Sequence, residues 1–211
     1  MTPLFSIITA VFDPAPEHLR ACIASVDAQT HPSWEHILVD DGSSRLGIKA
    51  ILDEMATDPR RTVIRRGSNG GIVVASNDAL GAAAGEFLVL LDHDDVLTPD
   101  ALATVAEALT DGVDVYYSDH DLLRADGRYG SPMYKPDFSP ERLRNHNYIT
   151  HLVVARRRVV ERLGGFRTGF DGAQDHDLLL RLAEVTTSFH HIPQILLHWR
   201  QSPSSVANDP M

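Results

Sequence analysis

The sequence has a single cysteine and no long apolar run. Cys22 stands alone among 211 residues, so no disulfide can form within the chain. Because Cys22 also falls on an apolar helical stripe, we expect it to pack in the core. No stretch of about 18 apolar residues occurs, and Met1 to Ser6 lacks a basic region followed by a long apolar one. We therefore expect neither a membrane span nor an export signal, and a cytoplasmic location.

Basic residues are also in the minority. The chain has 19 Lys and Arg against 29 Asp and Glu, a formal net charge of -10. Proteins that bind phosphate backbones normally present an excess of Lys and Arg, so we expect no nucleic-acid partner. Most acidic residues are expected to serve solubility, and a few to hold a cation. With 43% hydrophobic residues, the chain can bury one substantial core.

Short apolar runs alternate with helical patterns in the first half of the chain. Strands are expected at 5–12, 37–39, 62–64 and 87–91, and helical faces are expected at 19–26, 48–55 and 72–84. Continuously apolar strands that alternate with helices predict an α/β fold with a mostly parallel central sheet. In the second half, strands are expected at 113–119, 152–154 and 192–199, and helices at 139–144, at 156–163 and from about 175.

Acidic residues follow three of the expected strands. Asp13 follows the first, Asp40-Asp41 the second and Asp92-His93-Asp94-Asp95 the fourth. Ligands of parallel α/β sheets bind beyond the carboxyl ends of the strands, so these acids gather where a ligand is expected. A period of two places Asp92 and Asp94 on one side, and Pro99 suits the first turn of the next helix. Converging carboxylates favour Mg²⁺ or Mn²⁺; the alternative is helix capping by Asp94 or Asp95.

An ordered set of segments resembles the family-2 glycosyltransferases, which have the GT-A fold. The matching segments are Ser6 to Asp13, Val39-Asp40-Asp41-Gly42-Ser43, Asn69-Gly70-Gly71, Leu90 to Asp95, Tyr134 to Pro140, Gly164-Gly165-Phe166-Arg167, Gly172 to Leu178 and His198-Trp199-Arg200. The resemblance covers nearly the whole chain. It implies a Rossmann-like sheet with a donor-binding half at 1–118, a smaller acceptor-side half at 119–200 and a tail or linker at 201–211.

The resemblance also implies roles for individual residues. It implies a donor pocket formed by Ala10, Phe12, Asp13, Asp41, Asn69, Gly70, Asp92 and Asp94. It implies a Mn²⁺ or Mg²⁺ site at Asp94, Asp95 and His198. Asp175 keeps the position of the catalytic base, with capping of the following helix as the alternative. Gln174 replaces the family's usual Glu before this Asp, Asp177 is the reserve base and His151 lies on the acceptor side. Thr150 stands where relatives commonly have Gly, so we expect an altered sugar pocket.

The expected function is inverting, metal-dependent sugar transfer from a nucleoside-diphosphate sugar, of the UDP or dTDP type, to a glycan or lipid-linked acceptor. The resemblance implies polysaccharide or O-antigen assembly, peripheral contact at the inner face of the plasma membrane, and further domains of a longer chain. Two alternatives stay open: a non-catalytic nucleotide-sugar-binding domain and a sugar-phosphate nucleotidyltransferase. The latter is expected to carry a Gly- and Arg-rich loop after the first strand, which 9–16 lacks. Dehydrogenase and serine-hydrolase motifs are missing too.

Overall fold

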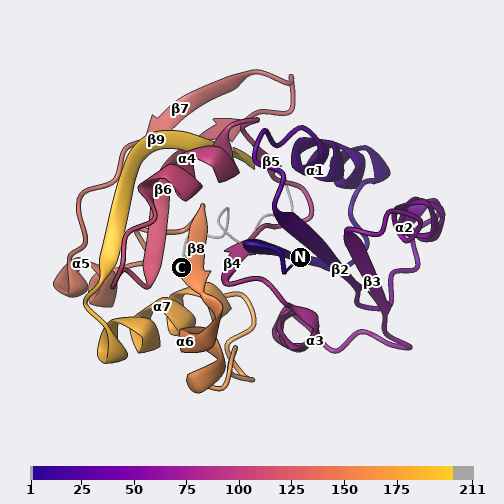
Figure 1. Cartoon of the computed structure of the whole chain (residues 1–211). Helices are drawn as coiled ribbons and strands as arrows, with labels where there is room; N and C mark the ends of the chain where they lie inside the picture. Colours follow the sequence, from indigo (N-terminus) through magenta and orange to yellow (C-terminus); the bar gives the residue numbers. More distant parts are fainter. Residues whose placement is uncertain (1, 202–211) are drawn as a thin grey trace.

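The four strands expected in the first half form the parallel side of a nine-stranded sheet (Figure 1). They are β1 (Phe5–Val11), β2 (Trp34–Asp40), β3 (Arg61–Arg65) and β4 (Phe87–Leu90). The computed structural model describes residues 2–201, and in it these strands lie in the order β3-β2-β1-β4. Their pairing is parallel throughout, as the apolar strand pattern predicts.

The second half of the chain continues the same sheet and makes it mixed. Next to β4 lies β8 (Val153–Arg156), which is antiparallel to β4 and to β6 (Val115–Leu123). Beyond β6 lies β9 (Phe189–Arg200), parallel to β6. A single sheet therefore contains strands from both expected halves of the chain, 1–118 and 119–200. Of the expected tail at 201–211, only Gln201 belongs to the described residues.

Helices cover both faces of the sheet. One face carries α1 (Pro16–Asp27), α2 (Ile48–Met55) and α4 (Ala101–Ala108), which pack through apolar residues such as Cys22 and Leu102. The other carries α3 (Ile72–Ala82), α5 (Pro140–Asn145), α6 (Arg157–Arg162) and α7 (Gln174–Val185). Cys22 is fully buried, which agrees with the expected core position.

Two short strands were not predicted, and one helix begins later than expected. β5 (Val96–Leu97) pairs with β9, and β7 (Tyr129–Met133) pairs with β6. Both lack the apolar runs that mark buried strands, since β7 is largely exposed and β5 has two residues. The expectation that Pro99 lies in the first turn of a helix is wrong, because α4 begins at Ala101 after Asp100.

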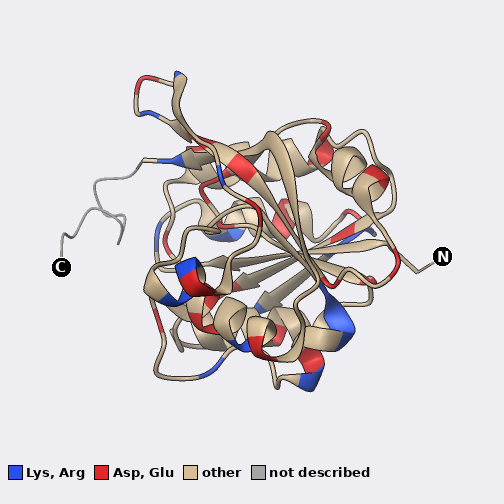
Figure 2. Cartoon of the chain, turned by 90° about the vertical axis from the view of Figure 1, so that its left-hand side faces the viewer, with Lys and Arg blue, Asp and Glu red and all other residues tan. Residues whose placement is uncertain are grey.

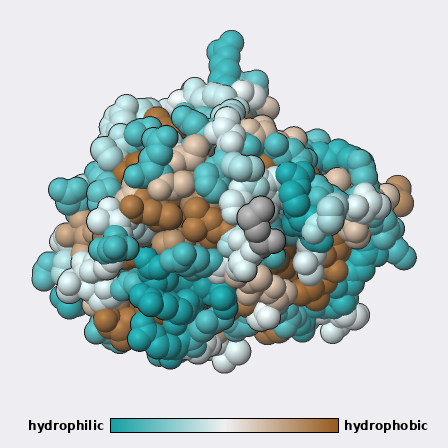
Figure 3. Space-filling view, in the orientation of Figure 1, coloured by the Kyte–Doolittle hydropathy of each residue, from teal (hydrophilic) through white to brown (hydrophobic). Residues whose placement is uncertain are grey.

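The surface is mixed in character. Acidic and basic residues are interspersed on the side that carries β7 and β9 (Figure 2). The face seen in Figure 3 is mostly hydrophilic, with smaller hydrophobic areas near its middle. Between residues 2 and 201, no helix has the length and apolarity needed to cross a membrane.

Candidate active site

The acidic segment after β4 is a tight turn. β4 ends at Leu90, and the amide of Asp95 donates a hydrogen bond of 3.2 Å to the carbonyl oxygen of Asp92. The prediction that a strand-like period of two governs this segment is therefore wrong. A turn brings positions three apart together, so Asp92 and Asp95 share a site, while Asp94 lines the neighbouring cavity.

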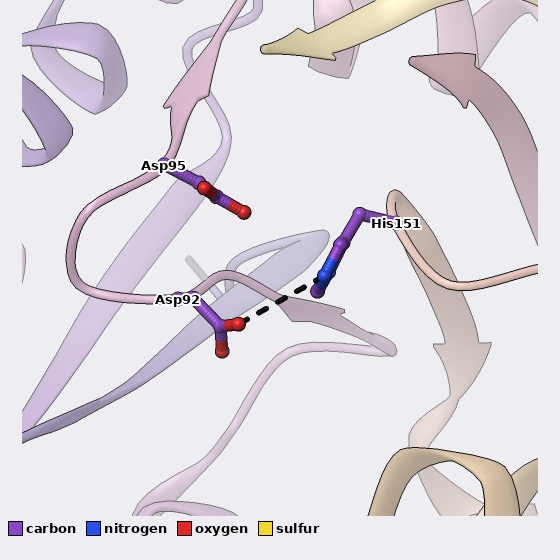
Figure 4. Close-up of side chains that lie close together, drawn as sticks. All are labelled: Asp92, Asp95 and His151. Carbon is purple, nitrogen blue, oxygen red and sulfur yellow. Dashed lines mark ion pairs between the residues drawn. The ribbon is translucent and has the colours of Figure 1, made fainter. Parts of the chain in front are cut away.

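Three side chains converge at this turn. One ligand atom each from Asp92, Asp95 and His151 lies within 4.8 Å of the others, and Nε2 of His151 is 3.9 Å from Oδ2 of Asp92 (Figure 4). His151 comes from the loop before β8, on the far side of the turn. Asp92 is about half exposed, at 49% of its side chain, so the cluster opens to the cavity on one side.

Asp95 is the most constrained member of the cluster. It is fully buried, and its Oδ1 accepts a hydrogen bond of 2.8 Å from the amide of Arg200, while Oδ2 is buried without a partner. Burial, together with the charges of Asp92 and Asp94, raises the pKa of Asp95 well above its usual value. A buried carboxylate oxygen with no donor needs either a proton or a cation. Two carboxylates and an imidazole suit Mn²⁺ or Mg²⁺, so the residues fit a divalent ion.

The expected cation ligands overlap this cluster only at Asp95. Nδ1 of His198 lies 2.5 Å from Oδ1 of Asp121, and its ring stacks on Tyr129 with centroids 3.8 Å apart. Asp94 accepts a hydrogen bond of 2.7 Å from Nε of Arg200 at its main-chain oxygen. The imidazole of His198 is thus held by Asp121, whereas Asp94 is held in the turn through its main-chain oxygen and lines the cavity.

A cavity of about 610 Å³ opens beside the cluster. Its walls come from β1, β4, α3, the loop before β8 and the start of α7. Among the residues with expected roles, it is lined by Ala10, Asp92, Asp94, His151, Gln174 and Asp175. The structure therefore brings the acidic turn and the expected base to one cavity.

Asp175 is the second residue of α7, and its carboxylate is oriented by Asn147. Nδ2 of Asn147 donates a hydrogen bond of 2.8 Å to Oδ2 of Asp175. The preceding Gln174 folds back and accepts a hydrogen bond of 2.8 Å from the amide of Gly172 at its Oε1. No side chain caps α7 through a hydrogen bond. Asp175 thus has a defined orientation without serving as the cap of its helix.

Asp177, the reserve base, is placed differently. Its side chain is 4% exposed and accepts hydrogen bonds from Arg167 and, at 2.9 Å, from Nε of Arg181. Burial acts to raise the pKa of Asp177, but the hydrogen bonds from the two guanidinium groups outweigh it and lower the pKa. Asp177 does not line the cavity. Its geometry is that of a packing residue that anchors α7.

The carboxylates of Asp41 and Asp13 accept hydrogen bonds from main-chain amides in the expected donor region. Buried Asp41 accepts hydrogen bonds of 2.9 Å from the amides of Gly70 and Gly71, which fixes the turn before α3. Asp13 accepts hydrogen bonds from the amides of Ser44 and Arg45 at 2.7 and 2.6 Å. The bond from Arg45 is the main cause that lowers the pKa of Asp13.

The remaining expected donor residues lie on the outside of this region. Phe12 is 48% exposed, and Asn69 and Gly70 are exposed. None of the three lines the cavity, whereas Ala10 does and accepts a hydrogen bond at its carbonyl oxygen from the ring of His93.

Sequence reasoning gave no role to three residues that contact the site. They are Asn147, Lys135 and Arg200, which contact Asp175, the carbonyl of His151 and the acidic turn respectively. Lys135 and Arg200 fall in segments that carry the family resemblance, and Asn147 lies between two such segments. Their roles depend on contacts across the fold, so spacing along the chain cannot reveal them.

A mixed sheet with an acidic turn after its fourth strand and a cavity beside that turn defines an α/β domain of the GT-A type. Residues 6–164 match the glycosyl transferase family 2, and the chain belongs to this family. Solved structures show the same fold. Residues 1–349 of TarS from S. aureus, in complex with UDP-GlcNAc, align with a TM-score of 0.77 at 19% identity, covering 98% of this chain and 61% of that one.

A second solved structure is the mannosyltransferase PcManGT from Pyrobaculum calidifontis in complex with GDP-Man and Mn²⁺. It aligns with a TM-score of 0.71 at 21% identity and covers 98% of this chain and 60% of that one. Both likenesses concern the fold alone.

Two curated relatives are closer in sequence. The O-antigen biosynthesis protein RfbC of Myxococcus xanthus is 41% identical over 209 residues, which is 98% of this chain but 16% of RfbC. The second is the "Putative teichuronic acid biosynthesis glycosyltransferase TuaG" of Bacillus subtilis. It is 31% identical over 154 residues, which is 72% of this chain and 59% of TuaG. The chain thus spans less than two thirds of either relative.

Proposed function

We propose that the chain is an inverting glycosyltransferase domain that depends on a divalent cation. It transfers a sugar from a nucleoside-diphosphate sugar, of the UDP or dTDP type, to a hydroxyl of a glycan or lipid-linked acceptor. The observation that carries the proposal is the buried, unpartnered Oδ2 of Asp95, which lies beside Asp92, and Asp92 lines the same cavity as Asp175. One cavity then offers a cation site and a carboxylate base.

The donor side uses the acidic turn. Asp92, Asp95 and His151 would hold Mn²⁺ or Mg²⁺, which supplies Lewis-acid neutralisation of a diphosphate leaving group. Asp41 keeps the turn at Gly70 and Gly71 in place beside α3, and we assign this region to the nucleoside. The complexes named above, TarS with UDP-GlcNAc and PcManGT with GDP-Man and Mn²⁺, support a nucleotide-sugar donor and a cation.

The acceptor side uses Asp175. Its carboxylate takes the proton of the acceptor hydroxyl while that oxygen attacks the anomeric carbon. The new glycosidic bond forms as the bond from the anomeric carbon to the diphosphate oxygen breaks, and the leaving group carries the electron pair away. Attack from the face opposite the leaving group inverts the anomeric configuration. The hydrogen bond from Asn147 leaves one lone pair of Oδ2 and all of Oδ1 for this task.

The relatives support surface-polysaccharide assembly as the setting. RfbC is named for O-antigen and TuaG for teichuronic acid biosynthesis. We infer a cytoplasmic enzyme with peripheral contact at the inner face of the plasma membrane, where a lipid-linked acceptor is presented. Further domains of a longer chain belong to the same proposal.

The test is a donor screen with the 211-residue chain, with Mn²⁺ or with chelator. We expect transfer or slow hydrolysis of one nucleotide sugar with Mn²⁺ and none with chelator. Asp175→Asn should bind the donor normally and lose about 100-fold or more of the turnover. Asp111→Asn, at an exposed position between α4 and β6, is the matched control. Full activity of Asp175→Asn, equal activity in chelator, or release of pyrophosphate in place of a nucleoside diphosphate would each refute the proposal.

A further inference from the structure

Lys135 is a buried amine that contacts the loop carrying His151, behind the candidate cation site. The chain has two lysines: Lys49 is exposed on α2, whereas Lys135 is only 8% exposed. A buried charge is tolerated when its donors are satisfied. Nζ of Lys135 donates to the main-chain oxygens of Ser118 and His151, and its amide donates a 2.9 Å hydrogen bond to Oδ1 of Asp119.

The carbonyl of His151 has a second donor. Nδ1 of His120 lies 3.1 Å from the same oxygen, so a side chain from β6 and one from the segment after β7 hold one peptide of the loop before β8. His120 is 1% exposed, and its Nε2 has no partner within the described residues. The polar groups of Lys135 and His120 are therefore directed at the main chain of His151.

The loop 147–151 joins the two chemical parts of the site. At one end, Asn147 donates to Asp175, and at the other, Nε2 of His151 lies 3.9 Å from Asp92. Between them, the amide of Thr150 donates a 3.2 Å hydrogen bond to Oδ1 of Asn147. Thr150 has φ of 45°, a conformation that a β-branched residue adopts only when its surroundings impose it. External anchors are needed to keep this loop in place.

We propose that Lys135 is a positioning residue that holds the loop 147–151 through the carbonyl of His151, and thereby sets the affinity of the Asp92, Asp95 and His151 cluster for a divalent cation. The part that concerns the cation presupposes the candidate cation site at Asp92, Asp95 and His151. The part that concerns the base, through Asn147 and Asp175, rests on the proposed function. Lys135 contacts neither ligand nor reacting atoms in this assignment.

The first test measures Mn²⁺ affinity of the purified chain by electron paramagnetic resonance, without donor or acceptor. Lys135→Met removes the donors while keeping the length of the side chain, and we expect about 10- to 100-fold weaker Mn²⁺ binding. Lys135→Arg retains donors and charge and should recover part of the affinity. Lys49→Met is the matched control and should bind as the parent does. Circular dichroism verifies that each variant is folded.

Unchanged Mn²⁺ affinity in folded Lys135→Met would overturn the proposal, as would equal losses in Lys49→Met. A second measurement needs no variant and covers the case in which Lys135→Met does not fold. With ¹³Cε-labelled lysine, the chain gives two lysine signals, and addition of Mg²⁺ should shift that of Lys135 but not that of Lys49. Two unmoved signals at saturating Mg²⁺ would also overturn it. Because no sugar is used, these outcomes are independent of whether Asp175→Asn loses transfer.

Discussion

The side-chain amide of Asn147 donates a hydrogen bond of 2.8 Å to the carboxylate of Asp175, which lies 28 positions later in the chain. The contact joins the loop before β8 to the first turn of α7, and both line the cavity. A carboxylate that accepts a hydrogen bond from a fixed side-chain amide keeps a defined direction. The relationship therefore assigns to Asn147 the orientation of the candidate base.

Replacing Asn147 tests this orientation. We expect Asn147→Ala to lower kcat about 10- to 100-fold, because a freely rotating carboxylate spends less time aimed at the acceptor oxygen. The KM for the donor should change less than about twofold, since Asn147 is not assigned to the donor. Steady-state kinetics separate the two parameters. Asn145→Ala, exposed at the end of α5, is the control, and an unchanged kcat in Asn147→Ala would contradict the assigned role.

Removing the charge of Asp95 is expected to weaken cation binding and to stabilise the protein when no cation is present. Its buried oxygen lacks a partner, and the neighbouring charges of Asp92 and Asp94 disfavour ionisation. Asp95→Asn keeps an oxygen for the amide of Arg200 and should gain about 1 kcal/mol or more in chelator. Thermal unfolding in chelator and Mn²⁺ titration provide the two measurements. A variant that is destabilised in chelator and still binds Mn²⁺ tightly would disprove this reading.

Mutation of Asp177 should change the stability of the protein much more than mutation of Asp175. Asp177→Asn leaves the guanidinium of Arg181, which is 10% exposed, with a weaker partner, and we expect a loss of about 3 kcal/mol in the free energy of unfolding. Asp175→Asn retains a hydrogen-bonding side chain next to Asn147 and should change stability by less than about 1 kcal/mol. Urea unfolding of the two variants decides between them. Equal stabilities would show that Asp177 does not anchor α7.

His36 gives the fold a dependence on pH. It is fully buried in β2, where burial and the nearby Arg61 lower its pKa to about 3, and its Nε2 lies 3.1 Å from Oγ1 of Thr9. Because the folded pKa lies below the unfolded value of about 6.5, the unfolded chain binds the proton first as pH falls. The stability that neutral His36 contributes to the fold is therefore intact above about pH 6.5 and is lost progressively towards about pH 3.

The measurement compares unfolding free energies at about pH 7.5 and about pH 5. His36 should account for a loss of about 2 kcal/mol at the lower pH. His36→Gln has no titrating group, so its stability should fall by that much less over the same interval. Partly exposed His31 serves as a control through His31→Gln. If His36→Gln and the parent lose equal stability on acidification, His36 is not responsible.

The parallel side of the sheet could be predicted from the sequence because its strands are short apolar runs between amphipathic helices. Ile37-Leu38-Val39, for example, falls within β2. The gathering of acids at the carboxyl ends of these strands follows from the same pattern. β7 could not be predicted in this way. Tyr129 and Met133 are more than half exposed, and because the strand has no buried face, its sequence shows no alternation of apolar and polar residues.

The pairing within the acidic segment depends on backbone geometry that spacing does not reveal. A strand would have paired Asp92 with Asp94, whereas the turn pairs Asp92 with Asp95. The association of His151 with these acids depends on β8 lying beside β4, a contact between distant parts of the chain. The exact residues of a site are therefore set by tertiary contacts even where its location is evident from the order of the strands.

The placement of β9 determines when the acidic turn can be completed during synthesis. β9 lies between β6 and β5, and its last residue, Arg200, supplies the amide that binds Asp95. Within residues 2–201, the last strand thus inserts between two strands made much earlier, a pairing of high sequence separation that forms slowly. On a ribosome, the nascent chain carries Asp95 long before it carries Arg200. Asp95 can acquire this hydrogen bond only after β9 has emerged from the exit tunnel.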